Sequence, residues 1–347
     1  MIRPVDRIPQ AIHCLALFSL FFAGMTHAGL TGLVHSADDS SVRIASIDSG
    51  DGSVSLGAAA ISDCCYLAAG LTAIDVDQGR VFAFGHYSSG AQAGDPVLMI
   101  FSLDGTTATE VVPGEVPRGV LAWDGQSERL VSAVMTAQPA GTQWITIDPL
   151  DGSVDLLGGE SSDCCELISG MGDIGDLPGG GRALFTVGRF FGASDWQLLV
   201  VDLADGAIQE LTALPTGRPG FLVVDDASGQ VDVLMQTSLG NPSLLYRIDP
   251  ADGQVTEQAV NSAENCCLTS PGDMASRSEG VTGVTWWIGG DGSNSSPDPG
   301  FFTLSANDSN ALTNRTTLQG DFYLHALIVS GTVVDPGLLF QDRFEFY

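Results

Sequence analysis

A pair of adjacent cysteines occurs three times in this chain, and its spacing limits the possible folds more than any other feature. The pairs are Cys64-Cys65, Cys164-Cys165 and Cys266-Cys267, so their first members stand 100 and 102 residues apart. Each pair follows the same kind of segment, which has an Ile-Asp dipeptide, a turn ending in Asp-Gly and a short β-forming run. A repeat of this kind is typical of folds that stack copies of one supersecondary unit.

A second repeat of about 50 residues lies within the longer one. The predicted units span 42–96, 97–142, 143–196, 197–242, 243–300 and 301–336. Each unit holds a β-rich run, an Asp-Gly turn, a second run, and then another hairpin led by a glycine. Asp and Gly tolerate the backbone of tight turns, so five dipeptides are predicted hairpin connections. They are Asp51-Gly52, Asp104-Gly105, Asp151-Gly152, Asp205-Gly206 and Asp252-Gly253.

Several β-forming runs are continuously apolar instead of alternating with polar residues. Examples are 97–101, 198–201 and 221–224, and this pattern predicts strands buried on both faces. Blades of a β-propeller are sandwiched between neighbours and recur at this spacing. We therefore predict an all-β, six-bladed β-propeller over residues 29–336, with four antiparallel strands per blade. Three two-blade repeats of about 100 residues would give pseudo-threefold symmetry, and strand 29–36 is predicted to close the ring.

The repeated Ile-Asp, Asp-Gly and glycine-led pattern resembles secreted bacterial β-propellers of the quinoprotein-like and surface-layer type. The resemblance covers roughly residues 30–335 and rests on turn residues, so it implies a fold and no particular activity. The tail 337–347 resembles the short Phe-x-Asp-x-Phe-Glu tails of exported proteobacterial proteins. A last edge strand is the alternative for the same residues.

The N-terminal segment has the features of an export signal. Arg3 and Arg7 precede an apolar stretch at 11–23, and Thr26-His27-Ala28 offers a cleavage site. We predict that residues 1–28 are a signal peptide removed near Ala28, which places the mature chain in the periplasm or outside the cell. No later apolar run approaches the ~20 residues of a membrane helix. The mature chain is predicted to be a monomer without a membrane span.

The chain is strongly acidic. It has 42 acidic and 13 basic residues, a formal net charge of −29, and no lysine. Lysine Schiff-base chemistry is therefore excluded, and scattered arginines do not supply the basic stripe that nucleic acids require. The charge favours solubility in saline or extracellular surroundings and the attraction of cations.

The six cysteines after the predicted signal peptide allow three arrangements. Export implies an oxidising compartment and hence disulfides. In the first arrangement each pair closes on itself as a vicinal disulfide, which is favoured because the pairing recurs without needing a distant partner. In the second, the pairs meet at the propeller axis and bond in a ring. In the third, the thiolates bind a soft metal such as Cu(I) or zinc.

Other motifs carry less information about chemistry. Gly170 to Gly175 matches a dinucleotide-binding pattern, but no helix is predicted after it, and we expect a loop. His35 and His86 occupy matching places in the repeat and are expected at strand ends. Tryptophans could stack on sugars, although a place in the core is favoured for them. Weak cation candidates by composition are Asp291, Asn294 and Asp298.

The sequence lacks the serine elbow of hydrolases and the His-Glu-x-x-His zinc motif. We therefore predict a non-enzymatic binding or surface-interaction module for an extracellular ligand or protein, with its site on the face that carries the three Cys-Cys loops. One alternative is a propeller enzyme, such as a quinone-dependent dehydrogenase or a calcium-dependent lactonase, by fold-level resemblance alone. Another is soft-metal binding by the cysteines. The residues specify no cofactor.

Overall fold

The chain is all-β in the part that the structure describes. The computed structural model describes residues 30–36, 39–48, 51–62, 64–137, 140–158, 164–214, 217–225, 228–236, 243–259, 261–262, 275–280, 283–290, 300–305, 311–317, 319 and 322–329. Within these ranges no helix is long and apolar enough to cross a membrane. The predicted signal peptide, the tail 337–347, Cys266-Cys267 and the three cation candidates lie outside them.

The first three sheets contain four antiparallel strands each. One sheet joins both ends of the described chain, in the order β25 (Phe322–Val329), β1 (Leu30–Ser36), β2 (Ser41–Ile47), β3 (Val54–Ile61). The second contains β4 (Cys64–Asp75), β5 (Arg80–Tyr87), β6 (Pro96–Ser102) and β7 (Ala108–Val111). The third contains β8 (Arg118–Asp124), β9 (Arg129–Ala137), β10 (Ala140–Ile147) and β11 (Val154–Leu156).

The later sheets follow the same order. The fourth contains β12 (Glu166–Asp176), β13 (Arg182–Arg189), β14 (Gln197–Asp202) and β15 (Ile208–Ala213). The fifth contains β16 (Arg218–Asp225), β17 (Gln230–Gln236), β18 (Ser243–Ile248) and β19 (Val255–Ala259). The last contains β21 (Ala275–Gly280), β22 (Gly283–Gly290), β23 (Gly300–Ser305) and β24 (Ala311–Thr317), with β20 (Asn261–Ser262) parallel to β24.

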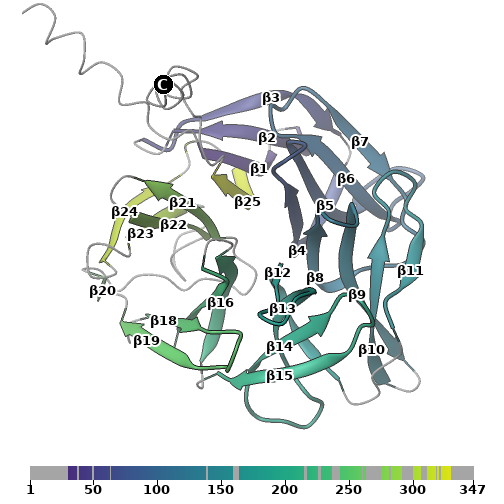
Figure 1. Cartoon of the computed structure of the whole chain (residues 1–347). Helices are drawn as coiled ribbons and strands as arrows, with labels where there is room; N and C mark the ends of the chain where they lie inside the picture. Colours follow the sequence, from purple (N-terminus) through teal and green to yellow (C-terminus); the bar gives the residue numbers. More distant parts are fainter. Residues whose placement is uncertain are drawn as a thin grey trace, which may run out of the picture.

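The sheets stand around a common centre (Figure 1). The inner strand of each sheet faces this centre, and inner strands of neighbouring sheets contact one another, as β4 contacts β8 and β12 contacts β16. The inner strand β25 comes from the C-terminal side, whereas β1, β2 and β3 of the same sheet come from the N-terminal side. The four-stranded antiparallel sheets therefore resemble propeller blades.

The core lies between neighbouring sheets, as the continuous apolar runs predicted. In β6, Val97 and Met99 pack in a cluster with the first sheet, while Leu98 belongs to a cluster with the third. All three side chains are fully buried. Burying one such side chain stabilises the fold by roughly 1.5–3 kcal/mol. Two-sided burial explains why these antiparallel strands do not alternate in polarity.

The Asp-Gly dipeptides form the predicted connections between the third and fourth strands of five sheets. In the turn between β2 and β3, the Gly52 N–H donates to Asp48 O at 2.9 Å, and the Ser53 N–H donates to Asp51 Oδ1 at 2.8 Å. The glycine has a φ of 75°, which glycine adopts without the steric cost that other residues pay. The Ser53 N–H also holds the pKa of the Asp51 carboxyl below its usual value.

The turns also join each sheet to the one before it. The carbonyl oxygens of Gly52, Gly105 and Gly152 accept hydrogen bonds from the N–H groups of Gln319, Ala59 and Gly114, at 2.9, 2.9 and 3.0 Å. A Cβ added at Gly152 would lie 2.5 Å from the Val112 carbonyl oxygen, and one added at Gly206 would overlap the Leu157 carbonyl oxygen. These glycines are therefore required by contacts between sheets as well as by the turn.

Glycines have a related use in β12, where the dinucleotide-like motif lies. The expectation of a loop is wrong here, because residues 170–175 belong to strand β12. Gly70 of β4 faces Gly170 of β12, and a Cβ added at Gly70 would overlap the Gly170 backbone. A Cβ added at Gly175 would lie 2.6 Å from Val224 Cγ1. The glycines let inner strands approach closely.

Each blade-like sheet has two distinct ends. At the turn end lie the Asp-Gly turns and the hairpin between the first and second strands, for example where Asp75 pairs with Arg80. At the other end of β5 and β13 lie the loops 88–95 and 190–196, next to the cysteine pairs 64–65 and 164–165. We call this second end the Cys end.

Replacing Gly206 by alanine tests the contact between sheets. Both Gly206 (φ 71°) and Gly79 (φ 63°) have a positive φ, but a Cβ at Gly79 meets nothing within 4 Å. Gly79→Ala is expected to cost about 1–2 kcal/mol of unfolding free energy for its backbone conformation. Gly206→Ala should cost a further ~1–3 kcal/mol through overlap with Leu157. Urea unfolding of both variants measures the difference, and equal losses would contradict the proposed contact.

Candidate functional site at the Cys end

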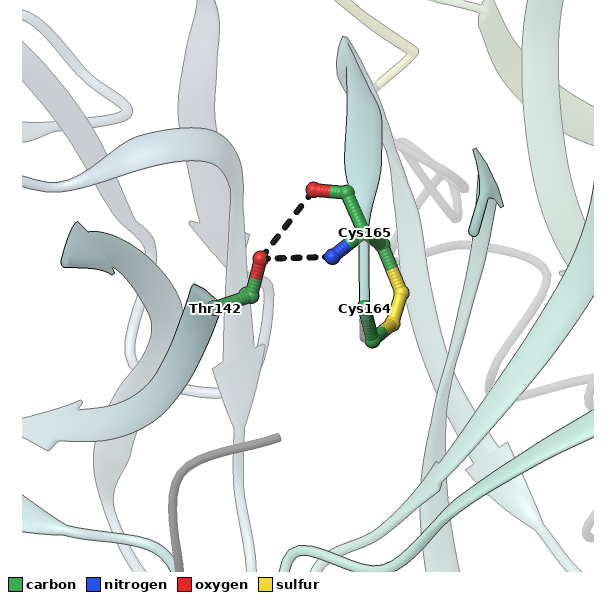
Figure 2. Close-up of a disulfide and its surroundings, with 3 residues drawn as sticks. All are labelled: Thr142, Cys164 and Cys165. Carbon is green, nitrogen blue, oxygen red and sulfur yellow. Dashed lines mark hydrogen bonds between the residues drawn. A yellow bond between two sulfur atoms is a disulfide. The ribbon is translucent and has the colours of Figure 1, made fainter. Parts of the chain in front are cut away.

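Cys164 and Cys165 are joined to each other by a disulfide (Figure 2). They stand directly before strand β12, and both residues have 0% of their surface exposed. This pair therefore has the vicinal arrangement, one of the three that the sequence left open. An oxidised, enclosed pair offers no thiolate to a metal ion.

Thr142 of strand β10 holds the pair against the third sheet. Its Oγ1 accepts a hydrogen bond from the Cys165 N–H at 2.9 Å and donates one to the Cys165 carbonyl oxygen at 3.1 Å (Figure 2). Thr142 is itself 0% exposed. Cys165 lies outside the strands, and the Thr142 hydroxyl satisfies both of its backbone groups. Leaving these buried groups unpaired would cost folding free energy.

The surroundings of the disulfide are apolar. Leu199 of β14 is fully buried against the pair, and Leu167, Phe190 and Ile208 pack around it. The contacts come from Thr142 of the third sheet and from apolar residues of the fourth sheet, so the disulfide lies between those two sheets. The bonding observed for this pair is not the axial ring of the second arrangement.

The first cysteine pair takes the corresponding place in the second sheet. Its backbone begins strand β4, where Cys64 pairs with Tyr87 at the end of β5. In the fourth sheet the residue after the pair, Glu166, likewise pairs with Arg189 at the end of β13. Both described pairs thus lie at the Cys end, beside the loops 88–95 and 190–196.

An ion pair and two aromatic residues anchor the loop 190–196. Arg189 Nε donates to Glu166 Oε2 at 2.7 Å, and the guanidinium lies 4.6 Å from the centroid of the Trp196 ring. Phe190 packs on the disulfide, and Trp196 packs partly on the core between the fourth and fifth sheets. Between these anchors Phe191 is 43% exposed. The loop therefore presents one aromatic side chain to solvent from a fixed base.

The equivalent loop of the second sheet is built from small and polar residues. The strand pairing aligns Gly85-His86-Tyr87-Ser88 with Gly188-Arg189-Phe190-Phe191. Tyr87 takes the place of Phe190, and Ser88 takes the place of Phe191. The Tyr87 hydroxyl donates to Glu110 Oε2 at 2.8 Å, and burial, together with the Glu110 carboxylate, raises the pKa of Tyr87 to about 12.

The remaining predicted residues occupy structural positions where they are described. His86 Nδ1 lies 3.3 Å from the Gly94 carbonyl oxygen, and His35 and His86 occupy second strands near the Cys end, as predicted. Burial lowers the pKa of His35. Trp144 is fully buried, and Trp123 stacks on Phe82. Within the described part of the chain, no group of three or more His, Cys, Asp or Glu side chains could hold a metal ion.

Sequence reasoning did not single out Thr142 or Phe191. Thr142 lies 23 positions before its hydrogen-bond partner, and no local pattern marks such a pair. Phe191 could have been found by aligning the repeats position by position, because the exposed aromatic replaces a serine there.

Comparisons with known proteins show a fold and no family. The sequence matches no family model and no curated protein. By structure, the chain is similar to TolB from Acinetobacter baumannii, with a TM-score of 0.51, 13% identity, and coverage of 94% of this chain and 74% of that chain. It is also similar to a chain of a nidogen–laminin complex, with a TM-score of 0.54, 11% identity, and coverage of 88% and 99%. These likenesses support a β-propeller fold and carry no activity.

Replacing Thr142 by valine tests the brace between sheets. Valine keeps the shape but leaves the buried N–H of Cys165 without its acceptor, so we expect a loss of about 1–3 kcal/mol in unfolding free energy. Thr146→Val, at a half-buried position of the same strand, is the control and should change stability by less than about 0.5 kcal/mol. Urea unfolding under non-reducing conditions measures both. Equal effects would show that the hydroxyl is dispensable.

Alkaline pH tests the buried phenol of Tyr87. The folded state favours the neutral phenol, so its contribution is fully present below the ordinary tyrosine pKa of about 10 and is lost as pH rises to about 12. The unfolding free energy of the native protein should therefore fall more steeply above pH 10 than that of Tyr87→Phe. Unfolding curves at a series of pH values measure this. Parallel pH profiles would mean that Tyr87 titrates normally.

Proposed function

We propose that this chain is an exported six-bladed β-propeller, built from three two-blade repeats, that works as a non-enzymatic binding or surface-interaction module through its Cys end. The observation that carries the proposal is the contrast between the two ends of the sheets. At the turn end, four of the Asp-Gly glycines, at 105, 152, 206 and 253, pack against neighbouring backbones and leave no room for a larger side chain. At the Cys end, the loops 88–95 and 190–196 are exposed over much of their length and differ in composition.

The brace behind the loop 190–196 supports this proposal. The Cys164–Cys165 disulfide and Thr142 fix the segment behind the loop 190–196, and the side chains of the pair are enclosed. We assign the disulfide to the support of the contact surface, while the loop residues make the contacts. Loops held on a rigid scaffold are where binding residues most often occur. A buried disulfide also fits the oxidising compartment that the predicted signal peptide implies.

Hydrogen exchange on the full chain tests this function. Poly-L-arginine, dextran, heparin and phosphatidylcholine vesicles are added separately, and exchange is followed in peptides from both ends of the sheets. We expect at least one probe to slow exchange in 88–95 or 190–196 while leaving the Asp-Gly turns unchanged, because bound loops open less often. Protection confined to the turn end, or none with any probe, would overturn the assignment of the Cys end.

A further inference from the structure

We propose that Phe191 is the anchor of a docking surface for an arginine- or lysine-rich polypeptide segment. This inference rests on the proposed function and names the partner class for the same end of the molecule. Phe191 is 43% exposed, whereas its neighbours Phe190 and Trp196 are packed against the fold. Rigid aromatic side chains of this kind dominate binding energy at protein interfaces, because they bury a large area and lose little entropy.

The fold does not require an aromatic residue at this position. Ser88 stands at the equivalent position of the second sheet, at the same end of the second strand, and is exposed there. The aromatic at the preceding position, by contrast, is shared, since Tyr87 and Phe190 are both packed against neighbouring residues. Thus Phe190 has a packed aromatic counterpart in the second sheet, whereas Phe191 replaces an exposed serine there.

Charge around the loop favours a cationic partner. Arg189 is bound to Glu166 and stacked on Trp196, and Asp195 is exposed on the loop. Elsewhere, five other arginines form ion pairs with carboxylates: Arg43, Arg80, Arg129, Arg182 and Arg247. With a net charge of −29, the chain attracts basic segments and repels anionic glycans, nucleic acids and acidic membranes.

A polypeptide suits the geometry better than a small ligand. Phe191 stands at an exposed loop between two packed aromatic residues, so it can enter a partner's apolar pocket or lie along alternating apolar side chains. Basic side chains beside that contact would meet Asp195, which is exposed on the loop. Attraction between the charges would speed association, and the aromatic contact would slow dissociation.

Fluorescence anisotropy tests the inference with the full chain, purified with its disulfides intact. The probe is a labelled peptide of about 12 residues in which arginine alternates with leucine and tyrosine. The control probe has glutamate in place of each arginine. Phe191→Ser installs the residue found at position 88, so the fold should be kept, and thermal unfolding checks this. Leu150→Ser, at an 82% exposed position of the turn end, is the matched control variant.

The native protein should bind the arginine peptide, and added salt should weaken binding. Phe191→Ser should raise Kd at least about tenfold, while Leu150→Ser should change it by less than about twofold. Four outcomes would each overturn this inference. They are an unchanged Kd in Phe191→Ser, equal binding of the glutamate peptide, competition by neutral dextran, and no binding of the arginine peptide. The proposed function would still stand if hydrogen exchange shows another probe protecting the Cys end, and it fails separately if no probe does.

Discussion

The contact between each Asp-Gly turn and the preceding sheet is the interaction on which the arrangement of the sheets depends. Apolar burial holds the sheets face to face, but the hydrophobic effect is non-directional and does not by itself fix how one sheet is placed along the next. The turn glycine adds a directed contact, because its carbonyl oxygen bonds to the previous sheet and its missing Cβ allows backbones to touch. The turn aspartates bond to N–H groups of their own turn, as Asp151 does with Ser153. Much of the acidic composition therefore serves turn geometry.

This constraint separates the two ends of the molecule. A position that touches a neighbouring backbone has little freedom to vary, and the Asp-Gly pattern recurs in five sheets for that reason. The Cys end is held differently, by a disulfide and one threonine behind the loop 190–196. Such a brace acts from behind the surface, and it leaves the loop residues free to differ between sheets. The three cysteine pairs first suggest a metal or ligand site, yet the pair at 164–165 is enclosed and supports its neighbours.

The sequence predicted those features that depend on local patterns. Asp51-Gly52 and its equivalents indicated turns, because few residues adopt a positive φ. The run 97–101 indicated two-sided burial, because it lacks polar alternation. The sequence did not show where each sheet begins. The predicted units that begin at 97 and 197 start in third strands, because the continuous apolar runs lie there. The glycines of β12 looked like a loop because close approach between inner strands leaves no local signature. Thr142 has no local signature either, because its hydrogen-bond partner Cys165 lies 23 positions away.

The placement of the arginines bears on how a partner would be recognised. Asp75, Asp124 and Asp232 are nearly buried, and each is paired with a partly exposed arginine at 2.6 to 2.9 Å. These three arginines are thus committed to carboxylates that would be costly to bury alone. The chain as a whole keeps a formal net charge of −29. A diffuse field can speed the approach of a basic partner, but it cannot select where that partner binds. Selection must come from a local feature, and in the docking proposed for the Cys end the exposed ring of Phe191, between two packed aromatic residues, supplies one.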